Sequence, residues 1–206
     1  MTQVLIARTS SGDLKGAKQG DTWVFHGVPY AAAPIGDLRF KRPAAPERWT
    51  GVRDATTKAC IAPQAGSRLA AAMGDFDDKQ DEDCLTLTIS TPAADKKKRP
   101  VIVWLHGGAF WTGAGSLDWY SGVSLSAHGD VVVVGVNHRL GALGFMNLPG
   151  VSPPNLGIYD QMAALQWVSQ EIGAFGGDPD NITLMGQSAG GFSILVMLSD
   201  PSIRKL

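Results

Sequence analysis

The sequence predicts an α/β protein built on a mostly parallel, doubly wound sheet. Two continuous apolar runs, at 101–105 and 131–136, have the composition of strands that are buried on both faces. Between 156 and 173, apolar residues recur at every third or fourth position, which is the period of a helix. Because strands and helices alternate along the second half of the chain, we expect helices to cover both faces of the sheet.

Length and charge narrow the class of protein. The chain has 206 residues, enough for one domain with a substantial core. Lys and Arg number 18 and Asp and Glu number 19, so the formal net charge is −1 and the basic surface of a nucleic-acid binder is excluded. No apolar run approaches the roughly 18 residues of a membrane span, and the N-terminus lacks the pattern of a signal peptide. We therefore expect no nucleic-acid partner and no membrane span.

The first half of the chain predicts short strands and loops, because Gly and Pro recur up to about residue 60. Residues 62–83 are small, polar and acidic, but they lack the ligand spacing and central Gly of an EF-hand loop. We expect a solvated loop there and no metal site. Residues 85–90 alternate between aliphatic and hydroxyl side chains, which is typical of a half-buried strand. The basic run at 96–99 indicates an exposed turn between two strands rather than a targeting signal.

The second half repeats a pattern of strand followed by helix. The strand at 131–136 precedes the helical segment 156–173, for which Asn155 is a candidate N-cap. Residues 182–185 predict another short strand, and the helical pattern returns after Ala189. The apolar positions of these helices are expected to pack in the core.

The sequence Gly186-Gln-Ser-Ala-Gly190 has the clearest chemical meaning. It is a G-x-S-x-G motif at the point where a predicted strand ends and a predicted helix begins. A serine in that position occupies a sharp turn that exposes its hydroxyl above the sheet, and the flanking glycines let neighbouring backbone approach closely. Ser188 is therefore the candidate nucleophile.

A second motif, His106-Gly-Gly-Ala-Phe110, directly follows the first buried strand. Consecutive small residues at the carboxyl end of a strand expose backbone N–H groups that can face a developing oxyanion. A plain Gly-rich turn has the same composition, so this motif alone leaves both interpretations open. Its place ahead of the G-x-S-x-G motif, with each motif at a strand end, favours the catalytic one.

With these motifs in this order, the chain resembles the N-terminal part of type B carboxylesterases, the cholinesterase-like branch of the α/β-hydrolases. The resemblance covers nearly all of the chain. Its other matching segments are residues 25–31, 36–40, 49–54, 82–87, 131–134, 137–141, 160–161, 164–168 and 175–179. It implies that residues 1–206 are the N-terminal part of a single α/β-hydrolase domain, with the nucleophile elbow near the C-terminal end of this chain.

The resemblance also implies a serine esterase that hydrolyses small-molecule carboxylic esters without a metal or cofactor. Ser188 matches the family's nucleophile, which forms the acyl-enzyme. The residues that match the oxyanion-hole donors are Gly108, Ala109 and Ala189. Ala109 replaces a glycine of the family pattern without removing a backbone donor. Neither the acyl preference nor the alcohol preference follows from the sequence.

The chain has two cysteines, Cys60 and Cys84, and their spacing alone fits either a disulfide or two free thiols. The resemblance implies the disulfide. The compartment stays open in the sequence: a bridge would indicate a secreted or periplasmic protein, and free thiols a cytoplasmic one. The resemblance further implies two close, largely buried structural ion pairs near the active site, Arg39–Glu82 and Arg139–Asp178.

The catalytic base is missing from the expected place. In this family the acid and the histidine follow the serine, yet the residues after Ser188 include Asp200 and no histidine, and all four histidines precede it. We expect both groups in a downstream segment of the same esterase, and we expect the 206-residue chain alone to be inactive. Two alternatives stay open: a cholinesterase-like interaction module without catalysis, and an inactive truncated fragment.

Overall fold

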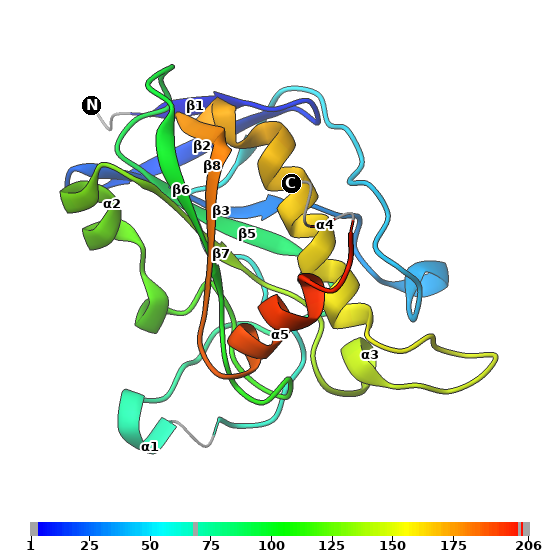
Figure 1. The fold of residues 1–206 in the computed structure, drawn as a ribbon. Helices are drawn as coiled ribbons and strands as arrows, with labels where there is room; N and C mark the ends of the chain where they lie inside the picture. The colour runs from blue at the N-terminus through cyan, green and yellow to red at the C-terminus, as the bar shows by residue number, and fades with distance from the viewer. Residues whose placement is uncertain (1–3, 68–69, 202, 204–206) are drawn as a thin grey trace.

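The computed structural model describes residues 4–67, 70–201 and 203 of the chain. Within these residues, eight strands form one sheet in the order β1-β2-β3-β5-β7-β6-β8, with β4 paired to β2 (Figure 1). The strands are β1 Leu5–Arg8, β2 Asp13–Gln19, β3 Thr22–Pro29, β4 Val52–Asp54, β5 Thr86–Thr91, β6 Arg99–Leu105, β7 Val132–Val136 and β8 Gly177–Gly186.

The sheet is mixed, so the prediction of a mostly parallel sheet is wrong for this chain. β6 runs parallel to β7 and to β8, and β4 runs parallel to β2. The pairs β1–β2, β2–β3, β3–β5 and β5–β7 are antiparallel. Short connections join the first strands, such as the turn at Gly20 and Asp21 between β2 and β3, and a short turn can join only antiparallel neighbours. The parallel strands β6, β7 and β8 are the ones that helices separate along the chain.

The described helices are α1 Ala70–Met73, α2 Val123–Gly129, α3 Gly141–Phe145, α4 Leu156–Glu171 and α5 Ala189–Met197, with 3₁₀ turns at Gly36–Leu38, Asp118–Tyr120 and Ile172–Phe175. The long helix α4 occupies the predicted helical segment. Its first turn follows Asn155, which adopts a left-handed conformation and forms no side-chain cap. None of the helices in the described part of the chain has the length and apolar character needed to cross a membrane.

Helices cover both faces of the sheet. Val134 of β7 belongs to the main core together with Leu165 of α4. Successive residues of a strand point to opposite faces, so Val133 points away from α4. On that opposite face, Gly122 at the start of α2 packs against Val133. The alternating sequence of β5 predicts a half-buried strand. In the structure, β5 is instead buried on both faces.

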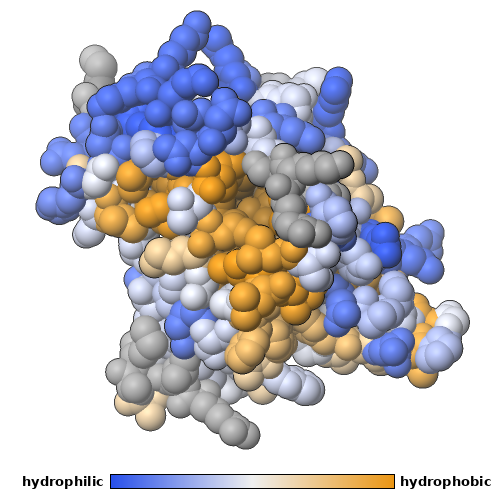
Figure 2. Space-filling model, in the orientation of Figure 1, coloured by the Kyte–Doolittle hydropathy of each residue, from blue (hydrophilic) through white to orange (hydrophobic). Residues whose placement is uncertain are grey.

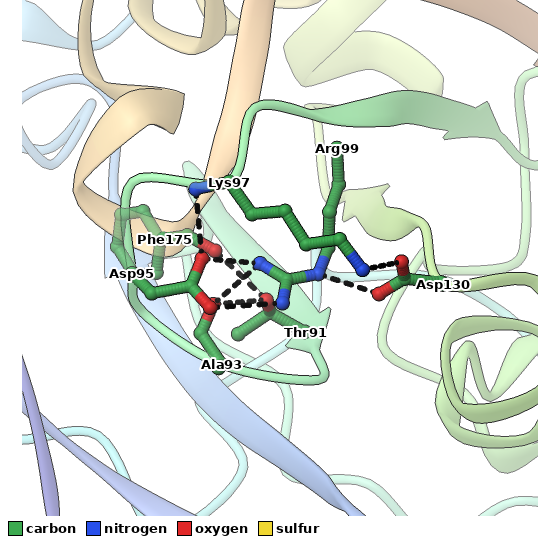
Figure 3. A network of polar contacts seen from close by, with 7 residues as sticks. All are labelled: Thr91, Ala93, Asp95, Lys97, Arg99, Asp130 and Phe175. Carbon is green, nitrogen blue, oxygen red and sulfur yellow. Dashed lines mark hydrogen bonds and ion pairs between the residues drawn. The ribbon is translucent and has the colours of Figure 1, made fainter.

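A polar network surrounds Arg99 at the start of β6 (Figure 3). Arg99 pairs with Gly177 at the start of β8, whereas Ser188 follows the end of β8, so the network lies at the opposite end of these strands from Ser188. Arg99, the first residue of β6, donates to both carboxylate oxygens of Asp95, at 2.6 and 3.0 Å, and to Asp130 at 2.8 Å. Thr91 at the end of β5 donates to the carbonyl of Phe175 at 2.8 Å. The three lysines before Arg99 are exposed, as expected for a turn, whereas Arg99 itself is buried and anchors β6.

An apolar surface covers the outer side of α5 and the adjacent strand β8 (Figure 2). Its residues are Met185, Phe192, Leu195, Val196 and Leu198, of which Phe192 and Leu195 are 65% and 66% exposed. β8 is also the last strand in the order of the described sheet, so one of its edges has no neighbouring strand there. Contiguous apolar surface and an open strand edge both promote association between chains.

We expect the 206-residue chain to self-associate through this surface, and Leu195→Glu to reduce that association by placing a charge in the patch. Size-exclusion chromatography with light scattering over a concentration series measures the effect. Leu125→Glu is the matched control, because Leu125 is an exposed leucine on α2, outside the patch, at 44% exposure. A wild-type chain that stays monomeric at every concentration would contradict this expectation.

Candidate active site

Ser188 lies on the turn between the end of β8 and the first residue of α5. Its backbone has φ 53° and ψ −117°, a combination that a residue with a side chain adopts only when its surroundings enforce it. The residue is exposed at the carboxyl end of the parallel strands β6 and β8. This is the strained and exposed turn that the G-x-S-x-G motif predicts.

Close backbone packing explains the two flanking glycines. A Cβ atom on Gly190 would overlap the carbonyl oxygen of Leu105, the last residue of β6. A Cβ atom on Gly186 would lie 2.6 Å from the carbonyl carbon of Gly190, again too close for a real contact. The turn that presents Ser188 can therefore approach β6 only with glycine at both positions.

Gly190→Ala is expected to unfold or displace this turn, whereas Gly191→Ala is not. The clash at position 190 is with backbone, which cannot rotate away, so we expect a loss of about 2 kcal/mol or more in the free energy of unfolding. A Cβ atom at position 191 would meet only the Gly186 carbonyl oxygen, at an ordinary 3.6 Å. Urea unfolding of the two variants measures the difference, and equal stabilities would contradict the packing explanation.

The loop after β6 carries three consecutive residues with positive φ: Gly108 at 112°, Ala109 at 55° and Phe110 at 65°. Trp111 and Thr112 donate their N–H groups back to the Gly108 carbonyl, at 3.0 and 3.1 Å, which closes the loop into a tight turn. Within the described residues, the N–H groups of Gly108 and Ala109 donate no hydrogen bond. These two donors are therefore free to bind a ligand.

Ser188 and this loop line the same cavity, which has a volume of about 620 Å³. Its lining residues are Ala65, Gly66, Ser67, Gly108, Ala109, Trp111, Thr112, Gln187 and Ser188. Ala189 follows Ser188 directly as the first residue of α5, where a backbone N–H has no partner inside its own helix. The hydroxyl and the three predicted N–H donors thus come from adjoining segments of one site.

Gln64 holds the far end of this loop, and sequence reasoning missed it. Its side-chain amide accepts from the N–H of Gly113 at 2.6 Å and donates to the carbonyl of the same residue at 3.0 Å. The backbone N–H of Gln64 in turn donates to Gln80 at 2.8 Å. Gln64 and Gln80, in the part of the chain expected to be a solvated loop, thus support the loop after β6. A lone glutamine carries no sequence signal of this role.

Two histidine rings lie stacked beside the loop, His106 and His138, with centroids 4.7 Å apart and planes 14° apart. Burial, together with the neighbouring His138, lowers the pKa of His106 to about 3, and burial lowers the pKa of His138 to about 4. Each ring nitrogen Nδ1 lies against a backbone carbonyl, that of Gly107 at 2.7 Å and that of Arg139 at 2.9 Å. Both rings are therefore neutral at pH 7.

These two rings predict a loss of stability in mild acid. The unfolded chain binds protons on both histidines below about pH 6.5, while the folded chain binds them only near pH 4 and below, so stability falls as the pH drops through that window. Between pH 7.5 and pH 5, each ring accounts for about 2 kcal/mol. Urea unfolding at the two pH values measures the loss. His128→Gln, at an exposed position on α2, should leave this loss unchanged. Equal free energies of unfolding at the two pH values would contradict the conclusion that the two buried rings are neutral in the folded chain.

Comparison with known proteins bears on what this site does. The sequence profile described as the carboxylesterase family matches residues 3–206. The chain belongs to the carboxylesterase family. It is 45% identical over 204 residues to a para-nitrobenzyl esterase of Bacillus subtilis, covering 98% of this chain and 42% of that relative. It is also 45% identical over 205 residues to a phenmedipham hydrolase of Pseudarthrobacter oxydans, covering 98% of this chain and 41% of that protein.

Solved carboxylesterase structures share the fold. A thermophilic PNB esterase superposes with a TM-score of 0.90 at 44% identity, covering 97% of this chain and 42% of that one. A Geobacillus stearothermophilus carboxylesterase gives a TM-score of 0.87 at 45% identity, covering 96% of this chain and 41% of that one. The chain therefore corresponds to the N-terminal part of an α/β-hydrolase carboxylesterase and spans about two-fifths of the length of these relatives.

In one of the two ion pairs expected in this carboxylesterase chain, the arginine binds a different acidic residue. Arg139 binds Asp160 of α4, through Nε and Nη2 at 2.8 and 2.6 Å, and both side chains are buried. The predicted pair of Arg139 with Asp178 is therefore wrong; Asp178 lies 3.5 Å from Lys98. Asp160 sits in the first turns of α4, against the segment that follows β7, whereas Asp178 is in β8, on the far side of β6.

The other pair has the expected partners but a different environment. Arg39 donates two hydrogen bonds of 2.6 Å to the carboxylate of Glu82. The Arg39 side chain is 46% exposed, so the expectation of a largely buried pair is wrong. Both residues lie in connecting segments at the surface, where water reaches the charges and weakens their contribution to stability.

The predicted disulfide between Cys60 and Cys84 is wrong, because the structure has both residues as free cysteines. Ile61 pairs with Gln80 in a parallel bridge, so Cys60 lies beside Lys79, five residues before Cys84. Cys84 instead points into the main core, and burial raises the pKa of its thiol.

Proposed function

We propose that this chain is the nucleophile-bearing part of a serine carboxylesterase, in which Ser188 forms an acyl-enzyme with a small-molecule carboxylic ester. One observation carries the proposal: an exposed serine on a strained turn shares a cavity with backbone N–H groups that have no partner in the described structure. The combination supplies a nucleophile and an oxyanion hole, the two protein groups that acyl transfer needs at the reacting carbonyl.

In the proposed reaction, Ser188 Oγ attacks the ester carbonyl carbon and transfers its proton to a histidine. The N–H groups of Gly108, Ala109 and Ala189 bind the oxyanion of the tetrahedral intermediate, each contributing about 3 kcal/mol to the transition state. The histidine then protonates the leaving alcohol. Water attacks the acyl-enzyme carbonyl in place of the alcohol and gives its proton to the same histidine, which returns that proton to Ser188 Oγ as the carboxylic acid leaves. No step calls for a metal or cofactor.

The histidine is proposed to come from outside this chain. His106 and His138 are buried with Nδ1 on backbone carbonyls, and His128 contacts the carbonyl of Ser124 on α2. His26 lies beside Gln19 at the other side of the sheet. The matched relatives are more than twice as long as this chain, so the histidine and the acid are expected in a downstream segment.

An apolar cavity beside the site is a candidate place for part of the ester. Trp111, which is 67% exposed, and Ala109 line both this cavity and the one at Ser188. Phe145 and Met146 close its other side, and its volume is about 380 Å³. Its apolar lining favours an aliphatic or aromatic group of the substrate over a charged one.

Complementation tests the proposed function. The 206-residue chain is assayed with p-nitrophenyl acetate in two forms, alone and joined to the downstream part of the Bacillus subtilis para-nitrobenzyl esterase, where we expect the histidine and the acid. We expect background hydrolysis from the chain alone and turnover from the joined protein. Rapid hydrolysis by the chain alone, abolished by Ser188→Ala, would place the base inside this chain and contradict the proposal.

The alternative of a non-catalytic interaction module has weaker support. Such a protein has no need of an exposed serine on a strained turn, nor of three unpaired N–H donors beside it. The alternative of an inactive fragment concerns the chain alone, and the same complementation assay decides it.

A further inference from the structure

His106 is the last residue before the oxyanion loop, and its ring is almost fully buried, with 2% exposure. Its Nδ1 lies 2.7 Å from the carbonyl oxygen of Gly107. A carbonyl oxygen can only accept a hydrogen bond, so Nδ1 carries the ring proton and Nε2 carries none. Nε2 is buried and has no partner in the described structure, which further disfavours a second proton there.

This hydrogen bond controls an N–H group of the proposed oxyanion hole. The carbonyl of Gly107 and the N–H of Gly108 belong to the same peptide unit, and the chain has no cis peptide bond among its described residues. In a planar trans peptide the two groups point in opposite directions. Since the buried ring of His106 holds the carbonyl, the Gly108 N–H is directed away from that ring. Gly108 itself lines the cavity together with Ser188.

The surroundings leave this peptide unit and the ring little freedom. The His106 ring stacks on His138, whose own Nδ1–H donates to the carbonyl of Arg139 at 2.9 Å. A Cβ atom on Gly113, at the end of the loop, would lie 2.6 Å from His106 Nδ1, so the backbone of Gly113 packs directly against the His106 ring. A Cβ atom on Gly107 would overlap the side chain of Gln187, the residue before Ser188. The loop is therefore held between the ring and the nucleophile turn.

We propose that His106 is a positioning residue of the oxyanion hole: through the Gly107 carbonyl, its Nδ1–H aims the Gly108 N–H at the oxyanion formed on attack by Ser188. Accepting a hydrogen bond at the carbonyl also polarises the peptide, so the N–H of the same unit becomes a stronger donor. This inference rests on the proposed function for its catalytic consequence, while the hydrogen bond itself is tested separately.

The catalytic consequence is tested in the joined protein with three variants. His106→Leu removes the donor at similar size, whereas His106→Asn keeps an N–H at the place of Nδ1. We expect His106→Leu to lower kcat by about 10²–10³-fold with little change in KM, as when one oxyanion donor is lost. We expect His106→Asn to stay within about tenfold of wild type. His128→Leu, on the exposed side of α2, is the control and should leave kcat unchanged.

A folded His106→Leu protein with wild-type kcat would overturn the proposal, as would a folded His106→Asn protein as impaired as His106→Leu. Circular dichroism and urea unfolding establish that each variant is folded. A merely structural role predicts that both variants lose activity in proportion to their loss of stability, without rescue by asparagine.

The hydrogen bond is tested in the 206-residue chain without any activity assay. Nitrogen-15 NMR of the imidazole rings at pH 7 distinguishes the two neutral tautomers. We expect His106 to carry its proton on Nδ1, and a proton on Nε2 would overturn the proposal. If the joined protein shows no turnover that depends on Ser188, the proposed function fails. The NMR measurement then still tests whether His106 Nδ1–H donates to the Gly107 carbonyl.

Discussion

Ser188→Ala in the joined protein is expected to lower kcat for ester hydrolysis by about 10⁴–10⁶-fold. Alanine keeps the backbone turn and the three N–H donors but removes the only group in the site that is proposed to form an acyl-enzyme. The oxyanion hole and substrate binding then supply the remaining catalysis. KM is expected to change little, because the serine hydroxyl contributes more to the transition state than to binding of the ester.

The rate is measured with a p-nitrophenyl ester under single-turnover and steady-state conditions, and the burst of acylation should disappear with Ser188→Ala. Ser169→Ala is the control, because Ser169 is a half-buried serine on α4 whose hydroxyl donates to the carbonyl of Gln166 in its own helix. A Ser188→Ala protein that keeps its burst would contradict the assignment of the nucleophile.

The largest expected effect on stability is at Asp160. Asp160→Asn should lower the free energy of unfolding by about 3–5 kcal/mol, because it strands the buried charge of Arg139. The Asp160 carboxylate accepts three hydrogen bonds from Arg139, two from the guanidinium and one from its backbone N–H at 3.1 Å. Complete burial raises the pKa of the Asp160 carboxyl, and these donors from Arg139 act against that rise.

Glu82→Gln is the matched control for Asp160→Asn. Both variants neutralise a carboxylate that binds an arginine guanidinium through two short hydrogen bonds, but the Arg39 side chain is about half exposed whereas that of Arg139 is buried. Water solvates Arg39 when its partner is lost, so the midpoint of urea unfolding should hardly move. A loss for Asp160→Asn no larger than that for Glu82→Gln would contradict the view that burial decides the effect.

The local features of the site follow from the sequence because short-range sterics determine them. Gly186 and Gly190 around Ser188 mark a strand–turn–helix unit. Glycine is needed at 190 because the backbone of β6 lies close, and at 186 because the backbone of the turn itself lies close. The small residues at 107–109 likewise mark a loop with positive φ and unpaired N–H groups. The buried strands β6 and β7 follow from their continuous apolar runs.

Contacts between distant segments do not follow in the same way. Arg139 has several acidic residues within reach along the sequence, and only the packing of α4 against the segment after β7 selects Asp160 over Asp178. Gln64 contacts Gly113, which is 49 positions away in the sequence, and no pattern in the residues around Gln64 predicts this contact. The first strands become antiparallel because short turns join them, a property that apolar patterning alone does not reveal.

Active-site labelling tests the central claim most directly. The joined protein is treated with a p-nitrophenyl alkylphosphonate, which transfers a stable phosphonyl group to an activated serine, and the digested protein is examined by mass spectrometry. We expect one adduct per chain, on the peptide that contains Ser188, and none in Ser188→Ala. An adduct on a different residue, or ester hydrolysis that continues without any adduct on Ser188, would contradict the claim that this serine is the nucleophile.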